Sequence, residues 1–303
     1  MTTRGHRRGG DGMHLVNAKS LLSAQNGMNV YRGCTHGCIY CDSRSTCYQM
    51  RHPFEDIEVK QNAPELLEQA LRSKRKRCMI GTGAMCDPYL HLEEELRITR
   101  RCLEIIERHG FGVAIQTKSD RILRDLPLLQ AIHAKAKCVV QMTLTTFDEA
   151  LCAILEPHVC TTRRRWEVLK ACQRAGIPTV VWFCPVLPYI NDTEENVRGI
   201  LSYCFDAGVQ GILSFGMGVT LREGDREYFF AALDRHFPGL KQRYVKRFGN
   251  AYECPSERNE ELMALFHREC EAHGVMHDPG QIFHYLHAFP ERDTSQQLSM
   301  FDL

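Results

Sequence analysis

The segment from Gly112 to Leu144, GVAIQTKSDRILRDLPLLQAIHAKAKCVVQMTL, contains two apolar runs separated by a helix-like stretch. The runs Gly112–Gln116 and Cys138–Leu144 are almost continuously apolar, which is typical of strands buried on both faces. Residues 121–134 between them have the length and composition of a helix. A strand, a helix and a second strand in this order predict parallel strands joined by a right-handed crossover.

The same alternation extends in both directions, from about residue 28 to residue 217. The further strands are predicted at Met28–Tyr31, Cys78–Gly81, Thr179–Val186 and Gly211–Phe215. The further helices are predicted at Pro64–Arg75, Glu93–His109, Thr162–Ala175 and Thr193–Ala207. Together these elements predict an α/β fold, a partial (β/α)6 TIM-like barrel over residues 13–217. The ligand site is expected at the carboxyl ends of its strands.

Beyond the barrel the pattern changes to a mainly helical C-terminal extension over residues 218–290. Amphipathic helices are predicted at Asp225–His236 and Arg258–His273, with the basic and aromatic stretch Lys241–Phe248 between them. We see no internal repeat.

The composition limits the class of protein. The chain has 303 residues, a formal net charge of +1, 44% hydrophobic and 25% charged residues, which excludes disorder for most of it. The longest apolar stretch, Val180–Leu187, is far shorter than the roughly 20 residues that span a bilayer, so no membrane role is expected. Residues 1–12 are basic and glycine-rich and predict a disordered leader. Fifteen cysteines, an odd number, argue against a secreted disulfide framework and favour a reducing cytoplasm.

Three of these cysteines are grouped directly after the first predicted strand, in Tyr31–Cys41, YRGCTHGCIYC. Cys34, Cys38 and Cys41 have the spacing C-x3-C-x2-C. Three clustered thiolates suit a [4Fe–4S] cluster in which one iron has no protein ligand and is open to chemistry. The alternative is a non-catalytic binding protein whose zinc site is completed by His36, Cys47 or a distant residue. We favour the cluster, because His36 lies too close within the triplet to complete an easy tetrahedron.

This motif resembles the radical S-adenosylmethionine (SAM) superfamily, and most closely its branch related to spore photoproduct lyase. The likeness continues in order along the barrel, in Cys86–Tyr89, Thr117–Ser119, Arg124-Asp125, Thr145-Thr146, Glu156-Pro157 and Arg165. The resemblance implies that SAM chelates the open iron through its amino and carboxylate groups. Reductive cleavage of SAM would then give a 5′-deoxyadenosyl radical that takes hydrogen from a substrate. It also implies an electron donor such as a flavodoxin or ferredoxin.

The resemblance also implies roles for glycines and a lysine at the predicted strand ends. Gly81 and Gly83 would receive the methionine end of SAM. The alternative role of these glycines is to allow a tight strand-to-loop turn. Lys118 would neutralise the SAM carboxylate, and its alternative is a solvated lysine.

Four more residues receive roles in the same way. Thr143 would meet the SAM ribose and Tyr40 would pack on the adenine; the alternatives are a strand threonine and packing beside the cluster. Glu156 and Arg165 either form an ion pair that shapes the site or contact SAM or substrate.

One departure limits the transfer of an activity. Spore photoproduct lyases carry a hydrogen-donating cysteine three residues before the position of Asp87, where this chain has Ala84. Cys86 is therefore the first candidate for a hydrogen-donor thiol and Cys184 the second, with inert packing as the alternative. The substrate is unassigned; the branch and local basic stretches suggest nucleic acid, in a repair, modification or lyase-like reaction.

The end of the chain carries one further motif, Gln297-Leu298-Ser299-Met300-Phe301. It resembles the bacterial sliding-clamp-binding peptide. A disordered tail would present Gln297 for hydrogen bonds and its three apolar residues to a hydrophobic cleft. The alternative is that these apolar residues fold back onto the chain's own core. A clamp tether would raise the effective concentration on DNA.

Overall fold

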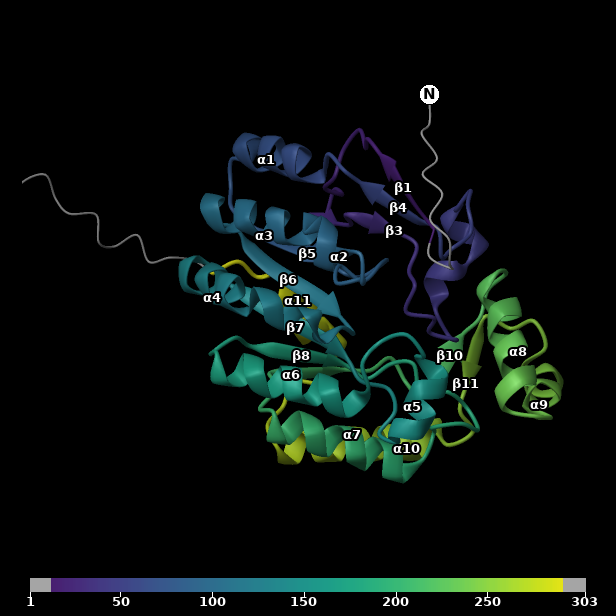
Figure 1. Cartoon of the computed structure of the whole chain (residues 1–303). Helices are drawn as coiled ribbons and strands as arrows, with labels where there is room; N and C mark the ends of the chain where they lie inside the picture. The colour runs from purple at the N-terminus through teal and green to yellow at the C-terminus, as the bar shows by residue number, and fades with distance from the viewer. Residues whose placement is uncertain (1–11, 291–303) are drawn as a thin grey trace, which may run out of the picture.

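The computed structural model describes residues 12–290 (Figure 1). Residues 1–11 of the expected leader lie outside the described residues. So does the clamp-like peptide with Gln297, Leu298, Met300 and Phe301. Within residues 12–290, no helix has both the length and the apolar character needed to cross a membrane.

Six parallel strands form the central sheet, in the order β2-β5-β6-β7-β8-β9. They are β2 (Gly27–Met28), β5 (Met79–Thr82), β6 (Gly112–Thr117), β7 (Cys138–Thr143), β8 (Thr179–Trp182) and β9 (Gly211–Leu213). Because the spatial order follows the chain order, every crossover joins neighbouring strands and all carboxyl ends lie at the same edge. The predicted α/β class and partial TIM-like barrel are confirmed.

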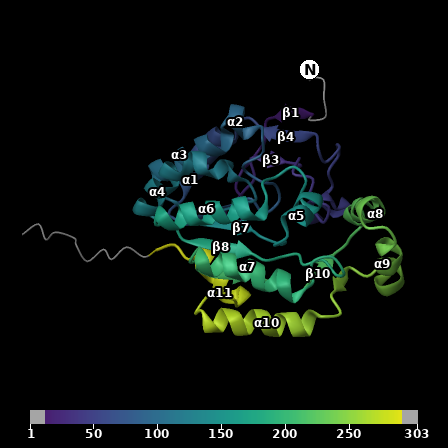
Figure 2. The ribbon, with the colours of Figure 1, turned by 60° about the horizontal axis from the view of Figure 1, so that its bottom comes forward.

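Helices cover one face of this sheet. They are α1 (Ala63–Ser73), α3 (Ile98–His109), α4 (Leu126–Lys135), α6 (Thr162–Arg174) and α7 (Glu194–Asp206). Their apolar sides pack with strand residues such as Val113 and Val140 into the largest hydrophobic cluster. From the C-terminal part of the chain, α10 (Asn259–Ala272) lies beside α7 in the same layer (Figure 2).

The opposite face of the sheet is closed by α11 (Pro279–His287), a helix that the sequence did not predict. Alternate strand residues pack against its Ile282 and Leu286, namely Met79, Ala114, Val139, Val180 and Leu213. Side chains on one face recur every second residue, so Gln116, Thr143 and Trp182 lie further along the same face. The helix α11 therefore forms the floor of the barrel interior, and these polar and aromatic residues lie above it.

The predicted first strand, Met28–Tyr31, divides between two sheets. β2 ends at Met28, whereas β3 (Tyr31–Arg32) pairs antiparallel with β4 (Ile57–Lys60). β4 in turn pairs parallel with β1 (Met13–Val16). The prediction that the cysteines follow a barrel strand is therefore wrong, since they follow β3 of this small N-terminal sheet. Pairing with β4 and a hydrogen bond from the Tyr31 hydroxyl to Glu93 hold β3 outside the barrel.

Other boundaries also differ from the predictions. The expected helix Glu93–His109 breaks at Arg97, whose φ is +50°, into α2 (Glu93–Leu96) and α3. A 3-10 turn, η3 (Asp120–Asp125), precedes α4, and the strand β8 ends at Trp182 before two prolines. Among the short elements that were not predicted are η1 (Asp42–Arg44), η2 (Thr46–Tyr48) and α5 (Glu149–Leu155).

The C-terminal extension packs on the cysteine loop. It contains β10 (Gly218–Thr220), α8 (Asp225–His236), α9 (Leu240–Phe248) and β11 (Glu253–Pro255), with β10 and β11 antiparallel. α8 has its predicted bounds, whereas the stretch expected between two helices is itself the helix α9. Phe229 of α8 and Tyr244 of α9 share an apolar cluster with Cys38, Ile39 and Tyr40. Figure 1 shows α8 and α9 at the same end of the molecule as β10 and β11.

Candidate functional site

Two glycines shape the loop that carries the three cysteines. Gly33 has a φ of +88° and Gly37 a φ of +71°, which other residues rarely adopt. A Cβ on Gly33 would lie 2.4 Å from the carbonyl oxygen of Phe54, and the Cys34 N–H donates to that same oxygen at 3.1 Å. The loop is thus pressed against residue 54 with no room for a side chain at position 33.

The three thiols are free, with no disulfide among the described residues. Cys38 is buried, whereas Cys34 and Cys41 are half-buried. Burial raises the pKa of the Cys38 thiol, and the charges of Cys41 and Cys34 add to this increase. Three free thiols whose charges influence one another suit a metal–sulfur group with three protein ligands.

Cys47, one of the candidates for the fourth ligand of a zinc site, has other contacts. It is exposed, and its sulfur lies 3.2 Å from the Ser45 hydroxyl and 3.2 Å from a guanidinium nitrogen of Arg222. His36 is also engaged, with its Nδ1 3.5 Å from the Asp87 carboxylate. These arrangements favour three thiolate ligands without a fourth protein ligand.

A pocket of about 580 Å³ opens beside the loop, at the carboxyl ends of β5 to β9. Half of the residues that were predicted to hold the cluster or SAM line this pocket, namely Cys38, Tyr40, Cys41, Lys118 and Thr143. Cys34, Gly81, Gly83, Cys86, Glu156 and Arg165 do not line it. The position of the pocket agrees with the expectation for a barrel of this type.

Lys118 brings a positive charge to this pocket. It follows β6, is half-buried, and its ammonium nitrogen lies 5.9 Å from the centre of the Tyr40 ring. Burial alone would lower the pKa of Lys118, but the charges of Cys38 and Glu156 outweigh it and raise the pKa. The lysine is therefore charged and available to an anionic ligand group.

Glu156 and Arg165 form an ion pair behind the pocket wall, and both side chains are fully buried. The Tyr40 hydroxyl donates to Glu156. Arg165 donates to the carbonyl oxygen of Thr143 at 2.9 Å and to that of Cys160 at 2.9 Å. The pair thus holds in place two pocket residues, the ring of Tyr40 and the end of β7, and its members do not reach the pocket themselves.

Asp87 connects the ends of β5 and β6 with the cysteine loop. Its carboxylate accepts hydrogen bonds from the Thr117 hydroxyl at 2.7 Å, the Lys118 N–H at 2.8 Å and the Tyr89 N–H at 2.8 Å. The matching segments Cys86–Tyr89 and Thr117–Ser119 therefore meet in space. Asp87 was not predicted as a site residue, although a carboxylate beside a predicted strand end was the available signal.

The two candidate hydrogen-donor thiols lie in different places. The Cys86 sulfur is buried behind the cysteine loop and donates to the carbonyl oxygen of Gly33 at 2.7 Å. Cys184 lines the pocket after β8, and burial raises the pKa of its thiol to about 12. Cys184 is thus at the pocket, whereas the S–H of Cys86 is directed to the backbone.

Two aromatic residues of the pocket were missed. Trp182 ends β8 and lies on the barrel's inner face, where its indole N–H donates to Gln141 at 2.9 Å. Phe215 follows β9, lines the same pocket and is 62% exposed. Their ring centres are 6.1 Å apart. An exposed phenylalanine at a predicted strand end, where a barrel binds ligands, was the available signal.

Sequence comparison finds one matching family and several related proteins. The family described as the radical SAM superfamily matches residues 28–199. The uncharacterized protein Rv2578c of Mycobacterium tuberculosis is 30% identical over 241 residues, which are 78% of this chain and 70% of the relative. The uncharacterized protein MJ0683 of Methanocaldococcus jannaschii is 28% identical over 181 residues, 59% of this chain and 67% of the relative.

Solved structures with the same fold include several of spore photoproduct lyase. Its complex with dinucleoside spore photoproduct has a TM-score of 0.61 at 13% identity, covering 88% of this chain and 81% of that one. A double mutant with bound AdoMet and the same dinucleoside has a TM-score of 0.58 at 14% identity, covering 83% and 75%. The resemblance found in the sequence is therefore confirmed: the chain belongs to the radical SAM superfamily and shares the fold of spore photoproduct lyase.

Proposed function

We propose that the protein is a radical SAM enzyme in which Cys34, Cys38 and Cys41 hold a [4Fe–4S] cluster. When bound and reduced, such a cluster supplies the electron that cleaves SAM to methionine and a 5′-deoxyadenosyl radical. The observation that carries the proposal is the set of free thiols at the edge of a pocket that also contains Lys118. Membership of the superfamily supports the same chemistry.

The protein's own residues would bind and orient SAM. Lys118 pairs with the SAM carboxylate, Thr143 meets the ribose and Tyr40 packs on the adenine. Glu156 and Arg165 act as positioning residues, because they fix the Tyr40 hydroxyl and the Thr143 carbonyl from behind. Gly83 allows β5 to turn directly over the backbone of Gln116.

The test is anaerobic reconstitution of the full-length chain with iron and sulfide, followed by reduction with SAM present. We expect iron, sulfide and conversion of SAM to 5′-deoxyadenosine and methionine, with Cys38→Ala losing both cluster and cleavage. Cys47→Ala is the matched control, since this nearby cysteine is exposed and should leave both unchanged. Stoichiometric zinc without iron uptake would favour the non-catalytic zinc protein, and full cleavage by Cys38→Ala would remove the cluster assignment.

We also propose a nucleic acid, or a nucleotide part of one, as substrate, in a repair, modification or lyase-like reaction. Trp182 and the exposed Phe215 offer aromatic faces on which bases stack. Spore photoproduct lyase, which shares the fold, has been solved with a dinucleoside bound. Binding of labelled single-stranded DNA and RNA should weaken in Phe215→Ala, and no binding by the parent protein would remove this substrate class.

Three expectations on partners and location complete the proposal. The enzyme takes its electron from a flavodoxin or ferredoxin, and all fifteen cysteines are free, as suits a reducing cytoplasm. The peptide Gln297–Phe301 tethers it to a sliding clamp. Titration of a peptide of residues 291–303 against the clamp tests this tether: binding that is lost in Gln297→Ala and Phe301→Ala supports it, and no binding removes it.

A further inference from the structure

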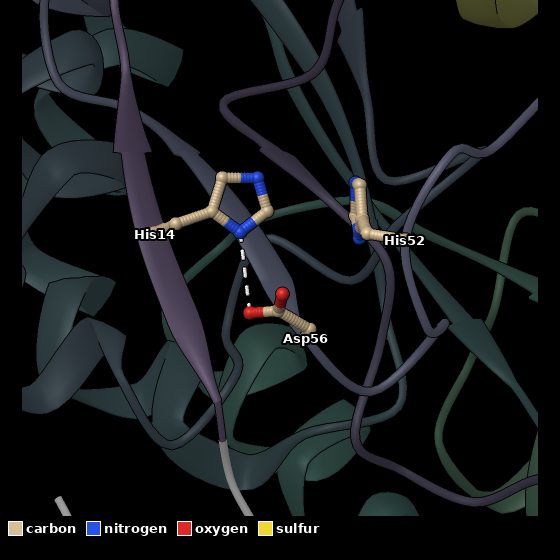
Figure 3. Close-up of side chains that lie close together, drawn as sticks. All are labelled: His14, His52 and Asp56. Carbon is tan, nitrogen blue, oxygen red and sulfur yellow. Dashed lines mark hydrogen bonds and ion pairs between the residues drawn. The ribbon is translucent and has the colours of Figure 1, made fainter. Parts of the chain in front are cut away.

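Outside the pocket, His14, His52 and Asp56 come together at the small N-terminal sheet (Figure 3). His14 lies on β1, Asp56 directly precedes β4, and His52 lies in the connection between the cysteine loop and β4. One nitrogen or oxygen atom from each side chain lies within 4.8 Å of those of the other two. In the part of the chain that the structure describes, no other three histidine, cysteine or carboxylate side chains are grouped in this way.

The three side chains contact one another directly. The His14 Nδ1 lies 3.2 Å from an Asp56 carboxylate oxygen, as Figure 3 shows. The rings of His14 and His52 meet edge to face, with their centres 4.7 Å apart. His14 and Asp56 are partly exposed, so ions from solvent can reach the group.

His52 is oriented as a metal ligand would be. Its Nδ1 lies 3.1 Å from the carbonyl oxygen of Pro53, so a neutral ring that donates to this oxygen has its lone pair at Nε2. This Nε2 is shielded from solvent and has no hydrogen-bond partner within residues 12–290. Histidines that bind metals typically donate their other ring N–H to a carbonyl or carboxylate in this way. A buried acceptor without a donor is costly, and a bound cation would satisfy it.

A second carboxylate adds negative charge at the same place. Glu58 of β4 is the register partner of His14 on β1, so their side chains share a face of the sheet. A Glu58 carboxylate oxygen lies 3.7 Å from the His52 Nε2. Two imidazoles in their neutral, ligating form with two carboxylates carry a charge of −2, which one divalent cation balances.

We propose that His14, His52 and Asp56 bind a divalent first-row metal ion of the Zn²⁺ type, with Glu58 as a nearby charge partner. Two imidazoles and a carboxylate suit zinc and iron(II) rather than magnesium or calcium, which prefer oxygen ligands. The ion would fasten β1 to the segment 52–56. The carbonyl oxygen of Phe54 in that segment accepts from the Cys34 N–H, so the ion would stiffen the support of the cysteine loop.

The test must separate this site from the cysteine triplet, because clustered thiolates can also take up zinc from solution. We would therefore measure zinc uptake by the full-length chain that carries Cys34→Ser, Cys38→Ser and Cys41→Ser together. One zinc ion per chain is expected, with saturable binding that is lost on adding His52→Gln or Asp56→Asn. Glu58→Gln should weaken zinc binding by about 10- to 100-fold, as loss of an outer-shell partner typically does. His109→Gln is the matched control, because His109 has a carboxylate partner, Glu68, at 2.9 Å but no second histidine in its group.

A second measurement does not depend on the serine variants. Zinc and iron contents would both be measured in the wild-type chain after anaerobic reconstitution. The zinc content should reach one ion per chain. In His14→Gln the zinc content should fall, while the iron content should stay unchanged. Zinc should also raise the Tm of the parent and not that of His14→Gln, since a ligand stabilises only the state that binds it. No zinc uptake by the serine variant, or uptake unchanged by His14→Gln with His52→Gln, would overturn the proposal. If the reconstituted wild-type chain binds zinc as expected but does not cleave SAM, this result would count against the proposed function and leave the zinc site standing.

Discussion

Arg165 and Glu156 form a fully buried ion pair whose two ends hold different parts of the pocket. The guanidinium donates to the carbonyl oxygen of Thr143 at the end of β7, and the carboxylate accepts from the Tyr40 hydroxyl. A buried pair of this kind costs desolvation on both sides, so it is weak support for stability unless its remaining hydrogen bonds are satisfied. Here they are satisfied by pocket residues, which makes the pair a support for the site.

Breaking the pair from one side should destabilise the protein strongly. Arg165→Met leaves the Glu156 carboxylate buried without its main partner, which typically costs about 3–5 kcal/mol. Urea unfolding of the cluster-free chain measures this cost. Arg163→Met is the control, since Arg163 is exposed in the same helix, and its unfolding free energy should stay within about 0.5 kcal/mol of the parent. A loss below 1 kcal/mol in Arg165→Met would mean that water or Lys118 compensates the carboxylate.

The same pair predicts a sensitivity to acid. Burial alone would raise the pKa of Glu156, but Arg165 and Lys118 outweigh it and hold the pKa below its usual 4.5. A carboxyl group whose pKa is lowered by folding stabilises the native state above its unfolded pKa. This stability is lost as the pH falls from about 4.5 through the lower folded pKa.

Unfolding free energies measured between neutral and acid pH test this effect. Glu156→Gln should have lower stability at neutral pH and a flatter acid limb than the parent. An acid limb that is equally steep in Glu156→Gln would assign the acid sensitivity to other carboxylates.

Lys118→Met tests the role of the lysine in SAM binding. If its ammonium pairs with the SAM carboxylate in the half-buried pocket, removing it should cost about 2–5 kcal/mol of binding free energy. Equilibrium dialysis with SAM measures the affinity, and iron content should be unchanged. Lys76→Met is the control, because Lys76 is exposed before the amino end of β5. An unchanged SAM affinity would make Lys118 a solvated lysine.

The alternation of apolar runs and helical stretches was enough to predict the barrel, because its strands are buried and nearly continuous in apolar residues. β6 and β7 were predicted almost to the residue, at Gly112–Thr117 and Cys138–Thr143. The small sheet could not be predicted in the same way. Its β3 has only two residues, Tyr31 and Arg32, and becomes a strand only because β4, distant in sequence, pairs with it.

Site residues that directly follow a barrel strand could be placed from the sequence. Side-chain directions in loops, and contacts between residues far apart in the sequence, could not. Lys118 and Thr143 line the pocket because they lie at barrel strand ends, which converge in a parallel barrel. Cys38, Tyr40 and Cys41 also line it, but from the loop that follows β3 of the small sheet. That Cys86 faces the Gly33 carbonyl and Cys184 faces the pocket depends on side-chain direction after β5 and β8. Neighbouring residues in a loop give no periodic signal for such directions. The same holds for His14 and His52, which are far apart in the sequence.

Alanine substitutions at Gly81 and Gly83 should have different effects on stability, although both glycines belong to the same motif. Gly83 has a φ of +100°, and a Cβ there would lie 1.9 Å from the carbonyl oxygen of Gln116, so Gly83→Ala should cost more than about 1–3 kcal/mol of stability. Gly81 has open space around its Cβ position, so Gly81→Ala should stay within about 1 kcal/mol of the parent.

The two glycine variants differ in what they test. Gly81 lies on the inner face of β5, two residues beyond Met79, which packs on α11. Gly81 does not line the pocket, but if the methionine end of SAM lies against this strand end, an added methyl group would contact it. Gly81→Ala should therefore fold normally and bind SAM more weakly than the parent. Gly83→Ala should instead unfold at a lower urea concentration than the parent. If Gly81→Ala binds SAM as the parent does, SAM lies away from β5 and the role of this strand end is limited to the turn at Gly83.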